Sequence, residues 1–370
     1  MATFLSFGSS IGYLQGAPVV GNPILVRARS MNISRQSSDT LSFHRLCLVV
    51  YARLSTSSDF SSYPMSTPVG DSESVDIDIS SALRAVADSY VYTPSPTTYP
   101  CIIFHVKAYD EYMLNGEVKT NQGTAYLPSS TTYYGALMGR FTDMERLKAG
   151  PIKRVYDFCR KPTSSPQVVC VGETFAYTNT LNMPQGHVRG YDFQDIIDYV
   201  SNTQYRSLPE SIAVDIVNEG WQQIGDVQVI ALPAEQNRYQ FRFINGLGVL
   251  DSISVYSLRS TDINVTQSQH VISTGESFSS FTRGFVRKSR DFETWRLSSG
   301  PLDRAWQSWF VHEFLMAEHV WVLIDNEWVR CHILTEETVS GYDQTASNEL
   351  QVQFSVRLDI DGPVDPSIMV

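Results

Sequence analysis

The residues of this sequence that could do chemistry include a histidine-glutamate pair followed by a second histidine. His312 and Glu313 precede His319. A zinc hydrolase of the His-Glu-x-x-His type needs its second histidine four residues after the first, so that both imidazoles face the metal from one side of a helix. Position 316 is Met, and His319 lies at the end of the expected helix. We therefore interpret these residues as helix-surface positions and expect no metal.

A run of carboxylates before residue 80 could bind calcium. Its members are Asp71, Glu73, Asp76 and Asp78. An EF-hand loop needs Gly at its sixth position and Glu at its twelfth, and this run has neither. In SVDIDIS the acids alternate with apolar residues, which is the pattern of a strand with one solvated face. We favour the strand.

A stretch near residue 285 mixes basic with aromatic side chains, and such a mixture could form a platform for single-stranded nucleic acid. Its members are Arg283, Arg287, Lys288, Arg290 and Arg296, with Phe281, Phe285, Phe292 and Trp295. The whole chain carries a net charge of −11, whereas a general nucleic-acid binder needs a basic surface. A solvated strand face or an interface to an acidic neighbour is the better interpretation, and we expect no nucleic acid.

Four tryptophans cluster towards the C-terminus, namely Trp306, Trp309, Trp321 and Trp328. Tryptophan can stack on sugar rings or anchor a protein interface. We expect Trp306 and Trp309 to lie in a core between a helix and a sheet. For Trp328, which lies beside an expected turn, the sequence does not decide between a core position and a binding surface.

The sequence contains no P-loop or dinucleotide-binding motif. Gly8–Gly12 (GSSIG) matches G-x-S-x-G, but a nucleophile elbow also requires a strand before the motif and a helix after it. The Asn245-Gly-Leu-Gly segment lacks the helix that phosphate binding would require. The carboxylate pair of a glycoside hydrolase needs no local motif, so that alternative stays open. We expect a protein that is not an enzyme, with no catalytic residue, cofactor or metal.

The elements that must position these residues are mostly strands. In Arg238–Tyr256 the aromatic residues Tyr239, Phe241 and Phe243 alternate with polar ones, and Asn245-Gly246 predicts a hairpin corner. Asn115-Gly116 and Asp325-Asn326 predict two more corners. Further strands are expected in residues 22–34, 42–55, 74–80, 100–118, 161–179, 211–221, 226–232 and 350–360, with two more in residues 277–297.

Helices are expected at few places. Ser80 or Ser81 should cap one over residues 81–90, and Gly300 or Ser299 should cap an amphipathic one that begins near Pro301. Partly helical segments are also expected in residues 137–147, ended by Gly150-Pro151, and in residues 186–200. The fold class is therefore mainly β, with two or three β-sandwich-like domains, a few short helices and one amphipathic helix in the C-terminal domain.

The length of 370 residues exceeds what one core usually holds. A Pro-rich stretch at residues 92–99 predicts the first boundary. We expect an N-terminal arm with a β-sandwich-like domain (1–92), a middle β-rich domain with short helices (93–231), and a C-terminal β domain with one helix (232–370).

The compartment is predicted from the cysteines and the N-terminus. Five scattered cysteines without a C-x-x-C pair predict free thiols and a reducing environment, with Cys47, Cys101, Cys170 and Cys331 in apolar strand-like runs. The first twenty residues lack the basic and apolar regions of a signal peptide. No window approaches the roughly 20 apolar residues that span a bilayer. We expect a soluble protein, with no membrane partner.

The C-terminal third resembles a family. FRFINGLGVLD, the later SGPLDRAWQSWFVHEFLMAEHVWVLI, NEWVRCHIL and LQVQFSVRLDI are similar to uncharacterised tail-module structural proteins of phages and prophages of gut Bacteroidetes. NPILVRA and SVDIDISSALRA are similar to the leading β-domain of those proteins. The shared motifs are structural and transfer no site residue.

The resemblance implies a structural component of a phage tail or baseplate, assembled in the bacterial host cytoplasm and located in the virion. Its partners would be copies of itself, in a ring, and other tail proteins. The alternatives are a receptor- or glycan-binding tail protein and a glycoside hydrolase acting on surface polysaccharide.

Overall fold

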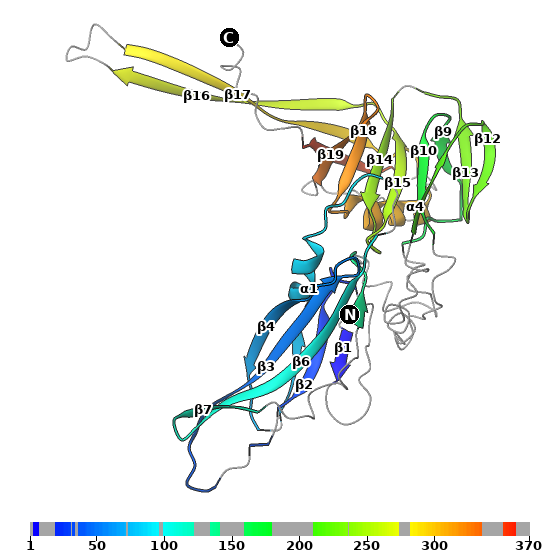
Figure 1. Cartoon of the computed structure of the whole chain (residues 1–370). Coiled ribbons are helices and arrows are strands. Elements are labelled where there is room, and N and C mark those ends of the chain that lie inside the picture. The colour runs from blue at the N-terminus through cyan, green and yellow to red at the C-terminus, as the bar shows by residue number, and fades with distance from the viewer. Residues whose placement is uncertain are drawn as a thin grey trace. The chain divides into compact units, whose positions relative to one another are not determined.

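The computed structural model confirms a mainly β protein with few short helices (Figure 1). It describes residues 3–6, 19–30, 32–33, 36–71, 73–95, 99–121, 134–140, 159–179, 210–235, 237–273, 282–334 and 351–359. The chain forms two compact units, each described by itself below. Unit 1 comprises Met1–Arg160, Tyr177–Ile212 and Ile244–Asp251, and unit 2 comprises Lys161–Ala176, Ala213–Phe243 and Ser252–Val370.

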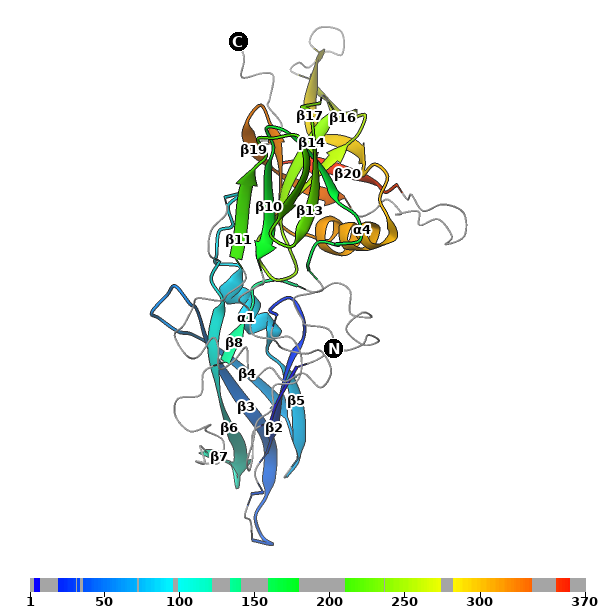
Figure 2. The same ribbon diagram turned by 90° about the vertical axis from the view of Figure 1, so that its right-hand side faces the viewer.

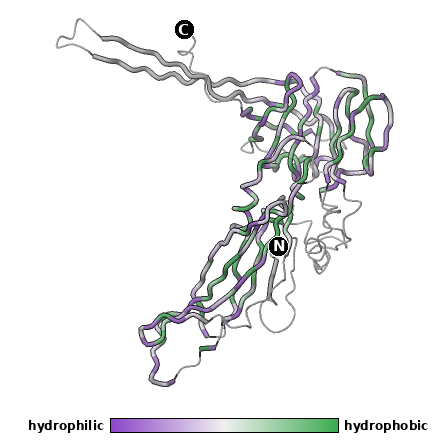
Figure 3. The backbone as a smooth tube through the Cα atoms, in the orientation of Figure 1, coloured by the Kyte–Doolittle hydropathy of each residue, from purple (hydrophilic) through white to green (hydrophobic). Residues whose placement is uncertain are grey.

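Two sheets form most of unit 1 (Figure 2). One has the order β1-β2-β5, and the other the order β4-β3-β6-β7, with β8 pairing β6. Alternate residues of β3, such as Leu46, Leu48 and Val50, are fully buried, and hydrophobic residues recur along β3 and β6 (Figure 3). Such one-sided burial is typical of sandwich-like packing. The strands are β1 (Thr3–Ser6), β2 (Ile24–Arg29), β3 (Leu41–Leu54), β4 (Ser61–Pro68), β5 (Ser74–Asp78), β6 (Ile102–Leu114), β7 (Glu117–Asn121) and β8 (Tyr134–Ala136).

The pairing of β3 with β6 is the longest in unit 1, running from Leu41↔Leu114 to Leu54↔Ile102. These two strands come from either side of the boundary that the Pro-rich stretch at residues 92–99 predicts, so segments of the first and middle predicted domains share one sheet. Helix α1 (Ser80–Ala87) lies between them in sequence and buries Leu83 and Val86, as its spacing predicts. Its predicted serine cap is wrong. Ile79 occupies the cap position without a side-chain bond, while the Asp78 carboxylate accepts the Ser80 amide at 2.9 Å.

Unit 2 contains a seven-stranded sheet with the order β15-β14-β18-β19-β20-β17-β16. A three-stranded sheet has the order β12-β13-β9, and β10 pairs with β11. The division between the units falls within β10, β11, β14 and β15. The strands are β9 (Gln167–Cys170), β10 (Thr174–Asn179), β11 (Glu210–Asp215), β12 (Gly220–Ile224), β13 (Val227–Leu232), β14 (Arg238–Ile244), β15 (Leu250–Tyr256), β16 (Ser260–Ser273), β17 (Thr282–Ser298), β18 (Val320–Ile324), β19 (Glu327–Leu334) and β20 (Gln353–Leu358).

The core of unit 2 is an aromatic cluster between the large sheet and a helical segment. That segment is α4 (Arg304–Trp309) followed directly by the π-helix η4 (Phe310–Leu315). Trp306 and Trp309 are buried in the cluster, as their spacing predicts. The predicted cap at Ser299 or Gly300 is wrong. Asp303 caps α4 instead, and its carboxylate accepts the amide of Trp306 at 2.8 Å.

Three hairpin corners are present where the sequence predicts them, and one of them has a different turn geometry. Asn115-Gly116 and Asp325-Asn326 both have positive φ, which is the geometry of a two-residue β-hairpin. At the third corner positive φ is carried by Gly248, at +82°, rather than by Asn245-Gly246. The Gly248 amide donates to the Asn245 carbonyl at 2.8 Å, so a β-turn is followed by one left-handed glycine.

The glycines of this corner also allow a close backbone approach within unit 1. A Cβ on Gly248 would lie 2.8 Å from the Gly139 amide nitrogen, and a Cβ on Gly139 would lie 2.2 Å from the Gly246 carbonyl oxygen. Contacts that short are excluded for a side chain, so these glycines are required by packing as well as by the turn.

The predicted alternation of the Arg238–Tyr256 hairpin is half correct. Phe241 and Phe243 are buried as expected, but Gln240 and Arg242 are buried as well. Gln240 donates to the Thr174 carbonyl, and the Arg242 guanidinium lies 4.2 Å from the centre of the Trp328 ring. Both faces of this strand are therefore covered.

Two of the expected helices lie largely outside the described residues, namely those in residues 137–147 and 186–200. So do both ends of the last expected strand, Leu350 and Ile360. Among the described helices, none has the length and hydropathy needed to cross a membrane.

Candidate functional site

The most unusual feature of unit 2 is a long hairpin that leaves its sheet. Strands β16 and β17 pair antiparallel from Ser260↔Arg296 to Ser273↔Thr282, but β20 pairs with β17 only from Thr294 to Ser298. We call the described strand segments 264–273 and 282–293 the hairpin arm (Figure 1). Twelve residues of β17, 282–293, precede the part that pairs with β20, and at about 3.3 Å per residue they span about 40 Å.

Both long edges of the hairpin arm carry unpaired backbone groups. In the described part of the chain no third strand pairs with β16, or with β17 before Thr294. An isolated two-stranded ribbon has marginal stability in water, and its free N–H and C=O groups can pair with another chain. The arm also contains most of the basic residues noted in the sequence, among them Arg287 and Lys288. Its geometry and composition are those of a contact element.

Trp221 is an exposed tryptophan of unit 2 that lies outside the aromatic cluster considered in the sequence. Trp221, on β12, is 69% exposed, and Val217 just before the strand is 71% exposed. Across the sheet, Trp221 is the register partner of Ile230, and Ile230 that of Val168. Register partners lie on the same face, so the three form one apolar row. The sequence signal was available: GWQQI places tryptophan between glycine and glutamines, where a strand face can be open to solvent.

A pocket of about 300 Å³ lies in unit 2 next to this row. Its wall includes Val168 and Leu232, which belong to the same small sheet, together with Tyr256 and Trp306. Tyr256 is 52% exposed, while the Trp306 indole is held by a hydrogen bond to the Ser165 carbonyl at 2.9 Å. The size suits one sugar ring or one large side chain.

Two charged side chains of the pocket wall have partners within the fold. Arg238 lies in the wall, and its Nε is 3.3 Å from the Glu173 carboxylate. Partial burial would raise the pKa of Asp303, but hydrogen bonds from the Ser165 hydroxyl and the Trp306 amide outweigh it and leave that pKa below 3.8. A glycosidase needs a carboxyl whose pKa is raised so that it can donate a proton. Asp303 cannot serve as that acid.

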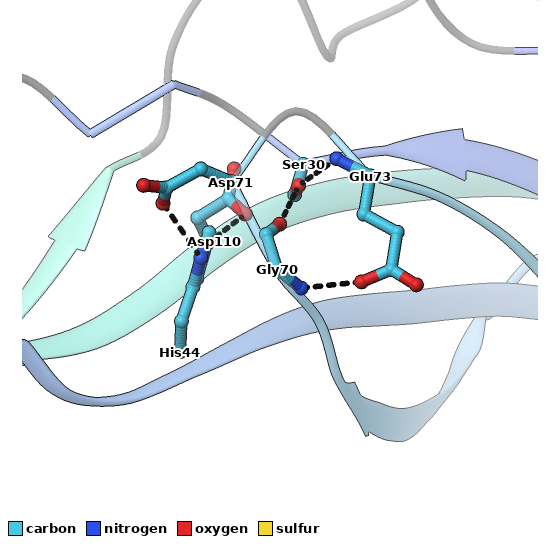
Figure 4. Close-up of polar contacts among 6 residues, drawn as sticks. All are labelled: Ser30, His44, Gly70, Asp71, Glu73 and Asp110. Atoms are coloured by element: carbon cyan, nitrogen blue, oxygen red, sulfur yellow. Dashed lines mark hydrogen bonds and ion pairs between the residues drawn. The ribbon is translucent and has the colours of Figure 1, made fainter.

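A buried histidine of unit 1 forms the most concentrated polar cluster in the described residues (Figure 4). His44 Nε2 lies 2.8 Å from the Asp110 carboxylate, and its Nδ1 lies 3.5 Å from that of Asp71. His44 belongs to β3, Asp110 to the neighbouring β6, and Asp71 to the turn before β5. The Nε2 nitrogen is hydrogen-bonded to the Asp110 carboxylate, whereas the buried Nδ1 nitrogen makes no hydrogen bond within the described residues.

Three further hydrogen bonds hold the same turn. The Ser30 hydroxyl donates to the Gly70 carbonyl at 2.5 Å, and the Glu73 amide donates to the Ser30 hydroxyl at 2.8 Å. The Gly70 amide in turn donates to the Glu73 carboxylate. This network fastens the turn between β4 and β5 onto the sheet (Figure 4). Its role is structural.

Lys161 is a second buried charge, in unit 2. Its ammonium donates to the Gln167 side chain at 3.1 Å and to the Ser252 carbonyl. The rings of Phe175 and Trp309 lie 4.5 and 5.2 Å from the nitrogen. A reactive lysine needs an open approach to its nitrogen, and this one is enclosed by partners. It anchors the loop before β9.

The residues considered as metal ligands in the sequence do not form a metal site in the described part of the structure. The His319 Nδ1 lies 3.3 Å from Arg330, Glu313 is buried in η4, and within the described residues no group of His, Cys, Asp and Glu could hold a metal ion. The carboxylate run is divided among separate partners, since Asp71 faces His44 and Asp78 accepts the Ile24 amide at 3.0 Å. Asp76 and Asp78 are exposed on β5, as the alternation predicts.

The tryptophans predicted to lie in a core are buried, and the cysteines are free thiols as predicted. Trp306, Trp309 and Trp321 are buried, and Trp328 is half-buried below Arg242. All five cysteines are free and buried.

No family model matches the chain, and no curated protein matches it.

Proposed function

We propose that this chain is a structural component of a phage tail or baseplate, which acts by self-assembly into a ring and by contacts with neighbouring virion proteins. The observation that carries the proposal is the hairpin arm. A ribbon about 40 Å long with two free edges is unfavourable in an isolated subunit, and it is useful in a particle, where a neighbouring copy can cover it.

Two other observations support an assembly role. The Nε2 nitrogen of His44 and the ammonium of Lys161 are bound by partners within the fold, so these two groups hold strands in place. The resemblance of the C-terminal segments to tail-module proteins gives this assembly its context.

The test compares the full chain with a variant that lacks the arm. Val265 and Arg290 are register partners, so residues 266–289 can be replaced by Asn-Gly, which favours a two-residue hairpin turn. The deleted segment lies before the part of β17 that pairs with β20, and we expect the variant to fold. In sedimentation velocity at rising concentration, the full chain should form large species and the shortened chain should remain a monomer. A full chain that stays monomeric at every concentration contradicts the proposal.

A glycan- or receptor-binding role is the second candidate, and the pocket beside Tyr256 favours it. An exposed aromatic ring at the mouth of a pocket of about 300 Å³ suits stacking on a sugar. A glycan array probed with the full chain tests this candidate. Binding that Tyr256→Ala abolishes supports it, and an array without hits removes it.

A further inference from the structure

Assembly through the hairpin arm requires a surface on the neighbouring copy that receives it. A strand that adds to the edge of another sheet satisfies its own free N–H and C=O groups and those of the edge. The receiving surface should therefore contain an open sheet edge, and its charge should be opposite to that of the arm.

The edge of β12 fits the first requirement. β12 ends the three-stranded sheet β12-β13-β9, and no strand pairs with its outer side in the described part of the chain. In an antiparallel pair every second residue directs its N–H and C=O away from its partner, so β12 offers a short row of donors and acceptors. The apolar row that begins at Trp221 lies at the same edge and supplies surface that a partner can cover.

The charges fit the second requirement. The strand segments 264–273 and 282–293 of the arm contain four basic and two acidic residues, a net charge of +2 with histidine neutral. Residues 207–237, which include β11, β12 and β13, contain five acidic and no basic residues. Glu219, directly before β12, is exposed. Opposite charges on two surfaces steer their encounter and favour one orientation.

Other sheet edges fit less well. Pro64 and Pro68 on β4 remove backbone donors from that edge, and β15 is buried along nearly its whole length.

We infer that the hairpin arm of one copy adds to the free edge of β12 in a second copy and covers Trp221. This inference rests on the proposed assembly function and names the contact that produces it. The two surfaces differ, so the contact is heterologous, and its repetition closes into a ring or continues as a tube. The partner is a second copy of this chain.

Cysteine pairing between two differently labelled copies tests the contact. Gln223→Cys places a thiol on exposed β12, and Gln267→Cys places one on β16. The native thiols are buried and should not compete. Mixing the two variants under mild oxidation should produce a disulfide-linked dimer, whereas the control, Ser62→Cys on the exposed edge of β4, mixed with Gln267→Cys, should not.

The outcomes separate the contact from the assembly function. If the chains assemble but the 223–267 disulfide does not form, or forms no more than with the Ser62 control, the β12 contact is wrong while the assembly function stands. If the chains do not assemble at all, both fail. The basic arm is also tested with a single-stranded oligonucleotide by fluorescence anisotropy. Binding that is lost when residues 266–289 are replaced would assign the arm to nucleic acid and overturn the inference.

Discussion

Replacing Trp221 by alanine should separate folding from assembly. Only about a third of this side chain is buried within its own chain, because 69% of its surface is exposed. A large aromatic residue contributes about 250 Å², so about 170 Å² of Trp221 contacts water in the isolated subunit. That area is what a neighbouring copy can cover.

The expected effect on association is large. At about 25 cal/mol per Å², covering about 170 Å² contributes about 4 kcal/mol, which corresponds to about a thousandfold in the association constant. Ordering of side chains at the interface reduces this gain, so we expect Trp221→Ala to weaken association by roughly 100-fold or more. Folding should change little, by less than about 1 kcal/mol, since exposed substitutions have small effects on stability.

The assay is sedimentation equilibrium together with chemical unfolding of the same samples. Leu258→Ala is the matched control, since Leu258 is also an exposed apolar residue of unit 2, and it should leave association unchanged. The reasoning is refuted if Trp221→Ala assembles as tightly as the original chain. It is equally refuted if the variant loses several kcal/mol of unfolding free energy, because Trp221 would then belong to a core.

Three further predictions concern the fold. Asp303→Ala should lower the unfolding free energy by about 1 kcal/mol, the usual loss for a helix cap, while Asp303→Asn, which keeps a cap acceptor, should lose less; chemical unfolding measures both. Because the pKa of Asp303 is lowered in the fold from 3.8, the contribution of its charge to stability is complete above that pH and should be lost as the pH falls through the lowered value. The difference in unfolding free energy between the original chain and Asp303→Ala should therefore shrink in strong acid towards that between Asp303→Asn and Asp303→Ala. Phe314→Ala should cost about 3–5 kcal/mol, since this fully buried ring lies 5.2 Å from Phe241 and 5.6 Å from Phe354 between centroids; an unchanged denaturation midpoint would contradict that packing. Burial raises the pKa of the Cys331 thiol, so iodoacetamide should label it only after unfolding, and labelling of the native chain in mass spectrometry would contradict the structure.

The sequence predicts the fold best where local chemistry decides the backbone. Asn115-Gly116 and Asp325-Asn326 form the expected corners because few residues other than Gly, Asn and Asp tolerate positive φ. The apolar spacing of Trp306 and Trp309 likewise predicts a helix with a buried face, which α4 has.

Prediction fails where a distant segment decides the environment. Gln240 and Arg242 have the period of a solvated face, yet Thr174 and Trp328 cover them, and nothing in the Arg238–Tyr256 segment shows that. The cap of α4 was placed too early because Ser299 and Gly300 are good cap residues, while Asp303 is additionally held by hydroxyls from a distant loop.

Only one of the two candidate contact surfaces could be predicted from the sequence. Basic and aromatic residues near residue 285 attract attention by composition, and an interface to an acidic neighbour was the preferred interpretation. The length of the hairpin arm and the open edge at Trp221 follow from strand pairing, which depends on contacts far apart in the chain. A tryptophan's exposure cannot be read from its neighbours in sequence.

Electron microscopy of the purified full-length chain tests the central claim most directly. Assembly through a heterologous contact predicts closed rings or tubes with a fixed repeat, in which an elongated ribbon of density joins each subunit to the next. Images that contain only separate particles of 41.6 kDa, at concentrations well above those used for sedimentation, would contradict it.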